Sequence, residues 1–380
     1  MLKILHINSS EYAGGVAEML VSLIHKFGEG YTNKRLVIDR PIEFFNVTKK
    51  IHNNLHGKPV EFTEKDMEIY ETDYSADIKS LSMDYDIIVI HDPQPLPLIT
   101  YIKKVNLKAK VIWRCHIPID EESYAWKNLL KDYVNQCDVA IFSMQDYVPK
   151  DINIPVKIFT PCIDLHSIKN IPLDYNYRLK LLKDLGIEEN DKYIVQISRF
   201  DLLKGVEELV EAYNKLAIEM PDYKFVLASN LASDDPEGIQ VYKNLITLKK
   251  GNNIKLLILS DEPNLNKLQV NALQANAELV IQNSIQEGFG LVVTEAMYKG
   301  KIVITRKVGG LVLQIKHNEN GFIILPKSDL YSEIKALWWI KTKKEMGQKA
   351  KQSVIDNFGM DKLVDNYKQL IAGLIKEEIK

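Results

Sequence analysis

Residues 279–300, LVIQNSIQEGFGLVVTEAMYKG, join a short apolar run to a helical pattern through a loop that contains two glycines. The apolar run is continuous rather than alternating, which is typical of a parallel strand covered on both faces. The segment after Gly290 has the pattern of a helix. A strand followed by a tight loop and a helix is the repeating unit of α/β domains. The stretch therefore predicts an α/β fold with a parallel sheet.

The same alternation of β-branched runs and helical patterns extends over most of the chain. A polar, proline-containing stretch at 163–190 interrupts it, so we expect two doubly wound, Rossmann-like domains, at 1–168 and 169–359. Such domains imply a cleft between them, because open parallel sheets bind ligands at the carboxyl ends of their strands. The expected strands are 3–8, 35–39, 86–92, 110–117, 139–143 and 157–161, then 193–200, 224–229, 254–260, 279–284, 301–306 and 321–325.

The composition excludes several classes of protein. The 380 residues carry 49 Lys and Arg against 51 Asp and Glu, so there is no general basic field for nucleic acid. No run approaches the ~18–20 apolar residues of an integral membrane span, and the first ten residues begin a strand rather than a signal peptide. The cysteines have neither CxxC spacing nor an even count, which indicates a reduced, cytoplasmic protein. They are Cys115, Cys137 and Cys162.

Two glutamates stand eight residues apart around the loop of the opening stretch. Gly288 and Gly290 allow close approach of the backbone to a ligand, and the N-terminus of the following helix is a natural anion site. Glu287 would compete with a phosphate there unless it faces neutral hydroxyls, and Glu295 would reach a second hydroxyl pair. A nucleotide sugar has this layout of hexose hydroxyls, diphosphate and ribose diol. The alternative is a helix cap and a solvated glutamate, but the pair with both glycines favours a ligand.

Cations and glycines lie at the ends of other expected strands. Arg199 follows the first strand of the second domain and Lys204 opens the next helix, so both belong at the edge that carries the glutamates. Arg provides a fork for phosphate oxygens and Lys a compact charge; the alternative is an ordinary surface pair. Gly14 and Gly15 form a turn at the chain start. Because they lack the full GxGxxG spacing, a dinucleotide fingerprint is not supported.

Two histidines stand at the carboxyl ends of strands in the first domain. They are His91 and His116, in HDPQPLPL and WRCHIPID. A lone histidine is more often structural, but two that face the expected cleft are candidates for the site. Hydrogen-bonding residues near them could take sugar hydroxyls, namely Asp92, Gln94, Arg114 and Asp120. The other histidines, His6 among them, show no ligand spacing and indicate no zinc-type cluster.

These motifs resemble those of a known family. EGFGLVVTEA with its two glutamates, the Arg and Lys of SRFDLLKG, and AGGVAEML are similar to signatures of retaining GT-B glycosyltransferases of family 4, or glycosyl transferases group 1. Within this family, HDPQPLPLI, WRCHIPID and PCIDLHSIKN resemble trehalose synthases, which join an NDP-glucose to glucose, and trehalose phosphorylases are close relatives. The resemblance covers nearly the whole chain. It implies the GT-B fold, with a last helix at about 360–380 packing on the N-terminal domain.

The resemblance also implies a role for each motif. Arg199 and Lys204 would hold the donor diphosphate, while Glu287 and Glu295 would bind the hydroxyls of the donor sugar and of the ribose. His116 would lie beside the anomeric carbon, which makes it catalytic together with Arg199, Lys204 and Glu287. The donor site would further include Gly14, Gly15, Phe289, Gly290 and Leu291. The sugars would lie near His91, Asp92 and Gln94.

The expected activity is therefore transfer of glucose from UDP-, ADP- or GDP-glucose to a sugar, foremost glucose to give trehalose. A trehalose phosphorylase-like enzyme, a family 4 transferase with another sugar, glycan or lipid acceptor, and a nucleotide-sugar sensor without turnover remain alternatives. Because the protein supplies its own cations, no cofactor is expected to be required, although Mg²⁺ could assist. Residues 117–120, IPID, differ from the family pattern, so the acceptor stays open. The base and the oligomeric state, a homodimer included, stay open too.

Overall fold

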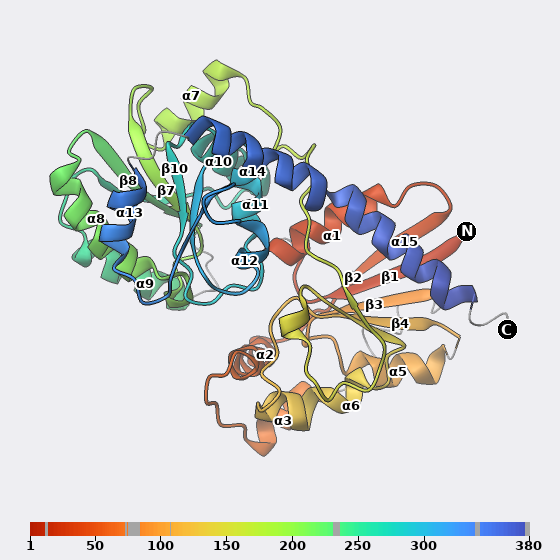
Figure 1. The fold of residues 1–380 in the computed structure, drawn as a ribbon. Helices are drawn as coiled ribbons and strands as arrows, with labels where there is room; N and C mark the ends of the chain where they lie inside the picture. Colours follow the sequence, from red (N-terminus) through yellow and green to blue (C-terminus); the bar gives the residue numbers. More distant parts are fainter. Residues whose placement is uncertain are drawn as a thin grey trace. The chain divides into compact units, whose positions relative to one another are not determined.

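The computed structural model describes residues 1–11, 14–72, 74, 84–106, 108–230, 236–338 and 343–376. The chain divides into two compact units, which we call unit 1 and unit 2 (Figure 1). Unit 1 comprises 1–161 together with 360–380, and unit 2 comprises 162–359. The domain boundary expected from the sequence, after residue 168, falls a few residues inside unit 2.

Unit 1 is built on a six-stranded parallel sheet of order β2-β1-β3-β4-β5-β6. The chain adds β2 on one side of β1 and then returns to add β3 on the other side, so the strand order reverses between β1 and β3. Ligands of open α/β sheets bind outside the carboxyl ends of strands at such a switch point. The strands are β1 (Leu2–Asn8), β2 (Tyr31–Val37), β3 (Ile87–His91), β4 (Lys110–Arg114), β5 (Val139–Phe142) and β6 (Val156–Ile158).

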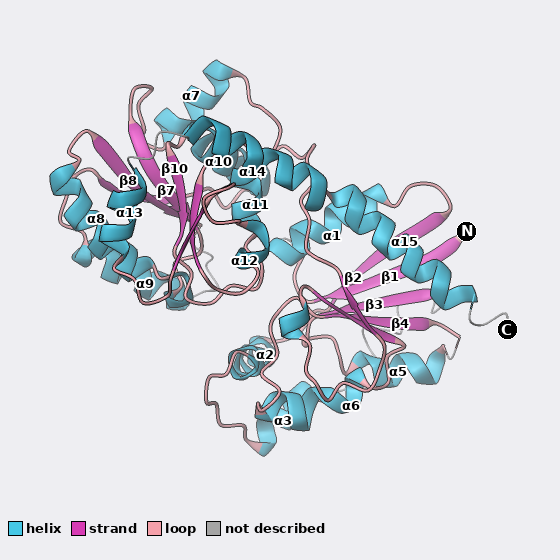
Figure 2. Ribbon diagram, viewed as in Figure 1, coloured by secondary structure: helices cyan, strands magenta, loops and turns pink. Residues whose placement is uncertain are grey.

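Helices cover both faces of this sheet (Figure 2). The last helix of the chain packs beside the first, since the Tyr367 ring lies 6.3 Å from that of Phe27 and 5.3 Å from that of Phe159. The right-handed crossovers of parallel strands place α1 on one face and α5 on the other. The helices are α1 (Gly14–Lys26), α2 (Ile42–Leu55), α3 (Glu64–Tyr70), α5 (Leu98–Val105), a π-helical turn (Trp126–Leu130), α6 (Lys131–Val134), a 3-10 turn (Gln145–Tyr147) and α15 (Met360–Lys376).

Unit 2 repeats the design with a six-stranded parallel sheet of order β12-β11-β10-β7-β8-β9. Here the chain builds outward from β7 to β9 and then returns to place β10 on the other side of β7, so the switch point lies between β7 and β10. The strands are β7 (Lys192–Ile197), β8 (Tyr223–Ser229), β9 (Ile254–Ile258), β10 (Leu279–Gln282), β11 (Val303–Arg306) and β12 (Phe322–Ile324).

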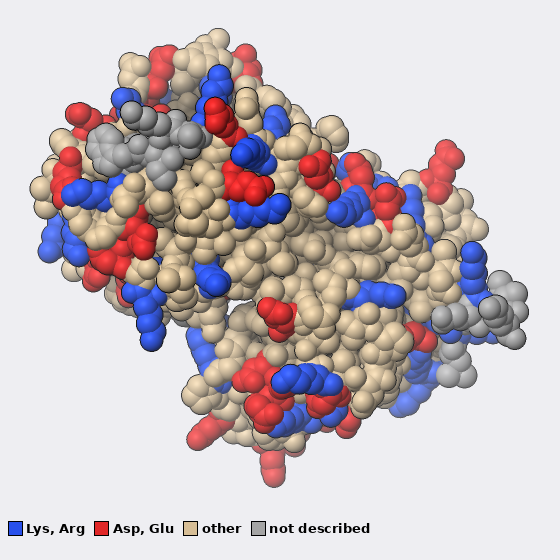
Figure 3. Space-filling model, in the orientation of Figure 1, with Lys and Arg blue, Asp and Glu red and all other residues tan. Residues whose placement is uncertain are grey.

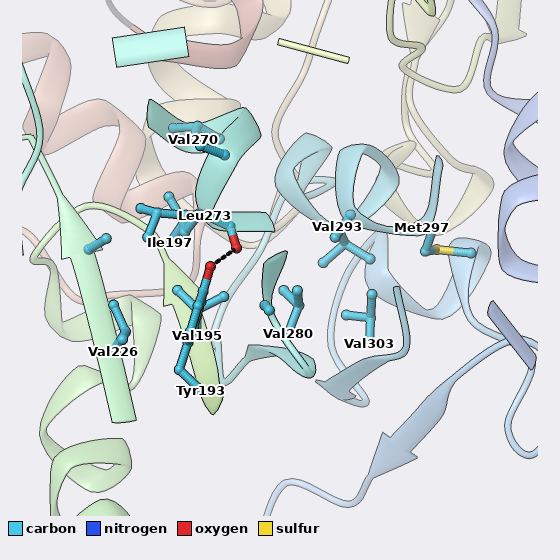
Figure 4. Close-up of a cluster of buried hydrophobic side chains, with 14 of the residues drawn as sticks. Tyr193, Val195, Ile197, Val226, Val270, Leu273, Val280, Val293, Met297 and Val303 are labelled. Carbon is cyan, nitrogen blue, oxygen red and sulfur yellow. Dashed lines mark hydrogen bonds between the residues drawn. The ribbon is translucent and has the colours of Figure 1, made fainter. Parts of the chain in front are cut away.

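Two hydrophobic layers hold the sheet of unit 2 between helices. One layer joins the sheet to α7, α10, α11 and α14, and the other joins it to α8, α9 and α13. Figure 4 shows the first layer, in which Val195 and Val280 pack from neighbouring strands and the buried Tyr193 hydroxyl donates to the Leu273 carbonyl at 2.7 Å. Each fully buried side chain of this kind stabilises the fold by ~1.5–3 kcal/mol. The helices are α7 (Tyr175–Asp184), a 3-10 turn (Leu202–Lys204), α8 (Val206–Glu219), α9 (Pro236–Leu248), α10 (Pro263–Asn276), α11 (Leu291–Tyr298), α12 (Leu311–Gln314), α13 (Leu330–Trp338) and α14 (Lys343–Asn357).

The surface carries charges of both signs. Figure 3 shows Lys and Arg interspersed with Asp and Glu on the visible face of each unit, in keeping with a formal net charge of −2. Within the part of the chain that the structure describes, none of the helices combines the length and apolar character needed to cross a membrane.

Candidate active site

The loops after β7 and β10 carry the charged residues that the sequence singled out in unit 2. The loop after β7 contains Arg199 and ends in the 3-10 turn that closes with Lys204. The loop after β10 contains Glu287 and leads into α11. Both loops leave the carboxyl ends of the strands at the switch point of this sheet, so the fold places these side chains where α/β sheets bind ligands.

The structure joins Lys204 and Glu287 in an ion pair. Lys204 Nζ lies 2.8 Å from Glu287 Oε2, and the side chains are only 17% and 11% exposed. Glu287 Oε2 also accepts a hydrogen bond of 3.0 Å from Ser284 Oγ. The two charges therefore share a largely enclosed position at the switch point, where each offsets part of the other's desolvation cost.

A network of polar side chains fixes the backbone on either side of this pair. Gln196 Oε1 accepts from the main-chain N–H of Asn283 at 2.8 Å, and Gln196 Nε2 donates to the Lys204 carbonyl at 3.0 Å. Asn283 Nδ2 donates to the Gly205 carbonyl at 2.8 Å. Gly205 has φ of 60°, and a Cβ there would lie 2.2 Å from the Asn283 carbonyl oxygen, so only glycine fits. The sequence analysis missed Gln196 and Asn283. Both are amide side chains at the end of an apolar strand, and this pattern could have identified them.

A buried cation that was not among the candidates, Arg306, completes this network. Its Nε donates to Asn283 Oδ1 at 2.8 Å, and its Nη1 donates to the carbonyls of Leu325 and Pro326 at 2.8 and 3.0 Å. Its Nη2 forms an ion pair with Glu208. Because these donors bond to the protein, Arg306 has a structural role: it links the loop after β10 to the segment after β12.

Arg199 lies in the same loop but not in the same ion pair. Its side chain is 62% exposed, and its Nη2 pairs with Asp201 Oδ2 at 3.0 Å. Exposed ion pairs contribute only ~0–1 kcal/mol. The guanidinium can therefore turn to an incoming anion at small cost.

The N-terminus of α11 begins at a glycine with left-handed geometry. Gly290 has φ of 83°, and a Cβ there would lie 2.7 Å from Leu311 Cδ2, so the tight entry into the helix requires glycine. The preceding carbonyl, that of Phe289, accepts from Gln314 Nε2 at 2.6 Å. The first N–H groups of α11, from Leu291 onward, carry the positive end of the helix dipole.

Glu295 is buried inside α11 and paired with a lysine from another segment. Its Oε1 lies 2.9 Å from Lys169 Nζ, with the side chains 3% and 15% exposed. Lys169 belongs to the polar stretch that precedes α7, which the sequence analysis treated only as an interruption between domains. Glu295 is thus neither a solvated helix position nor an isolated charge.

In unit 1 three of the predicted site residues, His91, Asp92 and His116, lie at the carboxyl ends of β3 and β4. His91 ends β3, and the next residue, Asp92, adopts φ of 64°, a strained geometry for a residue other than glycine. Asp92 Oδ1 accepts a 2.8 Å hydrogen bond from the main-chain N–H of His116. Desolvation raises the pKa of Asp92 to about 7, although that hydrogen bond and the charge of Arg114 act in the opposite direction.

The two predicted histidines bond to each other and to a third one. His91 Nδ1 lies 3.3 Å from His116 Nε2, and His91 Nε2 lies 3.1 Å from His6 Nδ1. Burial lowers the pKa of His91 and of His116 well below the usual value, and that of His6 to about 4. All three rings are therefore neutral near pH 7. The sequence analysis had set His6 aside, because spacing along the chain does not show which strands are neighbours.

The remaining predicted residues of unit 1 lie in different surroundings. Arg114 is fully buried and donates from Nη2 to the Phe159 carbonyl at 2.6 Å. Gln94 is half-buried, and Asp120 accepts from the main-chain N–H of Glu122 at 3.0 Å in a turn. Gly14 and Gly15 were expected in a turn, but they belong to α1: Gly14 is its first residue, and Gly15 is exposed within it. Residues 12 and 13, just before them, lie outside the described part of the chain.

Among the described residues, no group of three or more His, Cys, Asp and Glu side chains could hold a metal ion. Arg199, Lys204 and the start of α11 supply positive charge at the carboxyl edge of unit 2.

Known proteins match the chain over nearly its whole length. Residues 6–149 match the family model "Trehalose synthase, N-terminal domain", and residues 178–353 match "Glycosyl transferases group 1". A trehalose synthase of Thermococcus litoralis is 35% identical over 96% of this chain and 89% of its own. The chain belongs to the trehalose synthase family of the glycosyl transferases group 1. Another family member, a trehalose synthase of Rubrobacter xylanophilus, is 31% identical over 98% of this chain and 91% of its own.

More distant matches include a trehalose phosphorylase of Pleurotus pulmonarius, 27% identical over 86% of this chain but only 50% of its own. Among solved structures, Anabaena HepE in complex with UDP and glucose gives a TM-score of 0.73 at 18% identity, covering 98% of this chain and 100% of its own. A trehalose-6-phosphate synthase, OtsA, gives 0.77 at 13% identity, covering 97% and 99%. These likenesses confirm the predicted GT-B fold class. Membership of the trehalose synthase family confirms the predicted enzyme class, a hexosyltransferase.

Proposed function

We propose that this member of the trehalose synthase family transfers glucose from a nucleoside diphosphate glucose to free glucose, with retention of configuration, to give trehalose. The observation that carries the proposal is the enclosed Lys204–Glu287 pair at the switch point of unit 2, beside the N-terminus of α11. A cation, a carboxylate and a helix N-terminus at one sheet edge suit a ligand that is part phosphate and part sugar.

In this proposal unit 2 holds the donor. Lys204 and Arg199 bind the diphosphate, together with the main-chain N–H groups from Phe289 to Leu291. Glu287, held by Ser284, accepts hydrogen bonds from the hydroxyls of the donor glucose. Glu295 accepts from the ribose hydroxyls further along α11. The phosphate then competes with Glu287 for Lys204. Donor binding therefore uses a lysine that is already paired with a carboxylate.

Unit 1 supplies the groups for the sugars. The neutral ring of His116 bonds His91 through Nε2 and offers Nδ1 to a sugar hydroxyl, while His91 uses both of its nitrogens to bond His6 and His116. Asp92 is fixed by the main chain of His116, and Gln94 lies two residues further along. Gly14 and Gly15 place the start of α1 in the same half-site. We propose that His116 lies beside the anomeric carbon during transfer.

The chemistry asked of these residues is electrostatic. The bond between the anomeric carbon and the diphosphate oxygen breaks in an oxocarbenium-like transition state, and negative charge grows on the departing diphosphate. Arg199, Lys204 and the first N–H groups of α11 stabilise that charge. The acceptor hydroxyl attacks from the same face and passes its proton to the leaving phosphate oxygen, so no protein nucleophile is required.

The experiment is to incubate the protein with UDP-, ADP- and GDP-glucose and with a panel of acceptors that includes ¹³C-glucose, and to determine the linkage of any disaccharide by NMR. We expect an α,α-1,1-linked product that depends on a nucleotide donor, with and without chelator. A different linkage or acceptor would refute trehalose synthesis, and no product with any donor would refute the transferase.

A phosphorylase is the second candidate, favoured by the same basic edge and by the Pleurotus relative. It predicts glucose 1-phosphate from trehalose and inorganic phosphate without any nucleotide. Comparing this reaction with the nucleotide-dependent one on the same preparation separates the two candidates. Arg199→Ala, Lys204→Ala and Glu287→Ala should each lower the nucleotide-dependent rate.

A further inference from the structure

Three imidazoles from three neighbouring strands form a ladder across the sheet of unit 1. His6 pairs in register with Val89, so His91, two residues further along β3, faces the same side of the sheet as His6. His91 in turn pairs with Arg114, and His116 lies two residues beyond it. The ring centroids are 5.4 Å apart between His6 and His91 and 5.6 Å apart between His91 and His116. The ladder thus runs from the interior of β1 to the carboxyl edge where we place the sugars.

Hydrogen bonding couples the proton positions of the three rings. A neutral imidazole has one nitrogen that donates and one that accepts. His91 uses both of its nitrogens in the ladder, Nε2 toward His6 Nδ1 and Nδ1 toward His116 Nε2. If His91 carries its proton on Nε2, it donates to His6 and must accept from Nε2–H of His116. If it carries the proton on Nδ1, both neighbours must also be protonated on Nδ1.

Only two arrangements of a neutral ladder are therefore fully hydrogen-bonded, with all three protons on Nε2 or all three on Nδ1. The neighbourhood keeps the rings neutral. Burial is the main cause that lowers the pKa of all three rings; the charge of Arg114 on β4 acts in the same direction on His91 and His116, and that of Arg35 on β2 on His6.

The inner end of the ladder favours one of the two arrangements. His6 Nε2 and Asn33 Oδ1 are both buried, and neither has a hydrogen-bond partner among the described residues. Asn33 lies on the neighbouring β2 two residues before Arg35, which pairs in register with His6, so its side chain is on the same side of the sheet as His6. A proton on His6 Nε2 can be donated toward this acceptor, whereas a bare Nε2 offers it no donor. The other two rings then carry their protons on Nε2 as well, and Nδ1 of His116 is left as an acceptor.

We propose that His6 is a positioning residue, which through His91 fixes the proton of His116 on Nε2 so that His116 Nδ1 meets a sugar hydroxyl as a hydrogen-bond acceptor. The contact with sugar rests on the proposed function, whereas the proton positions do not. His6 itself touches no substrate in this scheme. It acts by accepting the hydrogen bond from His91 Nε2–H, which excludes the His91 tautomer with its proton on Nδ1.

The test is ¹⁵N NMR of the full chain with labelled histidine, because the nitrogen shifts of an imidazole distinguish a protonated from a bare nitrogen. In the unaltered protein near pH 7.5 we expect all three rings as Nε2–H. His6→Phe keeps an aromatic ring beside Phe27 but removes the acceptor for His91, so His116 should show mixed tautomers. His6→Asn presents an amide oxygen near the position of Nδ1 and should restore the single tautomer.

Kinetics provide the second measurement. His6→Phe should lower kcat by about three- to tenfold, the size of one neutral hydrogen bond, with KM for the donor nearly unchanged, and His6→Asn should recover most of it. His25→Phe, at an exposed position on α1, is the matched control. The coupling of the three tautomers would be refuted if the unaltered protein showed mixed tautomers. It would also be refuted if the His116 signal did not change in His6→Phe. Coupled tautomers without an effect on kcat would overturn the positioning role. If no transferase activity exists at all, the NMR result still decides the coupling, so the two failures are distinguishable.

Discussion

Replacing Lys204 by methionine tests the donor site most directly, because it removes the charge and keeps most of the apolar stem. Lys204 Nζ lies 2.8 Å from Glu287 Oε2 in a pair that is mostly enclosed. Loss of one preorganised donor to developing charge typically costs ~10²–10³ in rate, or about 2.7–4 kcal/mol. We expect kcat/KM for the nucleotide sugar to fall by this amount in Lys204→Met. Lys243→Met, at an exposed position on α9, should leave it unchanged.

The same substitution should also lower stability. Glu287 keeps hydrogen bonds from Ser284 at 3.0 Å and Gln282 at 3.4 Å, but its charge loses the Lys204 cation. Leaving a mostly buried polar group under-satisfied costs about 1–3 kcal/mol in the free energy of unfolding. Urea denaturation of Lys204→Met beside Lys243→Met measures this loss.

A double variant separates the structural role from the catalytic one. Lys204→Met combined with Glu287→Gln also removes the charge that Lys204 balanced, so stability should recover toward that of the unaltered protein. Activity should stay low, because both groups are proposed to bind the donor. The reasoning is refuted if the double variant regains kcat/KM together with stability, or if Lys204→Met alone keeps kcat/KM within about threefold, far short of the expected loss.

Three further predictions concern the surroundings of the site. Gly205→Ala should destabilise unit 2 by about 2–4 kcal/mol in urea denaturation, because φ is positive and the new Cβ would meet the Asn283 carbonyl oxygen at 2.2 Å; an unchanged midpoint would contradict the close approach. Lys169→Met should raise KM for the nucleotide sugar about tenfold with a smaller change in kcat, since Glu295 loses the partner that orients it; an unchanged KM would separate Glu295 from the donor. Because burial lowers the pKa of His6 to about 4 from 6.5, the folded state binds fewer protons than the unfolded chain between these values. The free energy of unfolding should therefore fall by about 3 kcal/mol as the pH drops through that window, and His6→Phe should remove this contribution; the same pH dependence in both proteins would exclude His6 as its source.

Strand prediction succeeded where a strand is covered on both faces. The six strands of unit 2 lie within a few residues of their expected positions, because continuous apolar runs leave little choice of structure. The exception in unit 1 is β2, expected at 35–39 but formed by Tyr31–Val37. It lies at the edge of the sheet, where half-exposed polar residues such as Thr32 and Asn33 join the strand without an apolar signal. The edge strands β9 and β12 of unit 2 were predicted because their runs are apolar, so the polar residues of β2 rather than its edge position hid its start.

The local motifs were likewise readable in the chain. Glycines that need positive φ, such as Gly290, and charged residues just after apolar strands depend on backbone geometry within a few residues. Local sequence determines such features, because the strand, the turn and the helix start are adjacent in the chain. The carboxyl edges of both sheets were therefore predictable from sequence alone.

Only the tertiary structure decided which residues support those motifs. His6 meets His91 because β1 and β3 are neighbours, and Lys169 reaches Glu295 from a segment more than a hundred residues away in the chain. Arg306, a cation at a strand end, is likewise defined by its partners, since it bonds Asn283 and Glu208 from distant parts of the chain. Strand order and helix packing set these distances, and neither leaves a pattern in the local sequence. The sequence by itself thus determined which charged and polar side chains follow each strand. Packing determined which partner each of these side chains has.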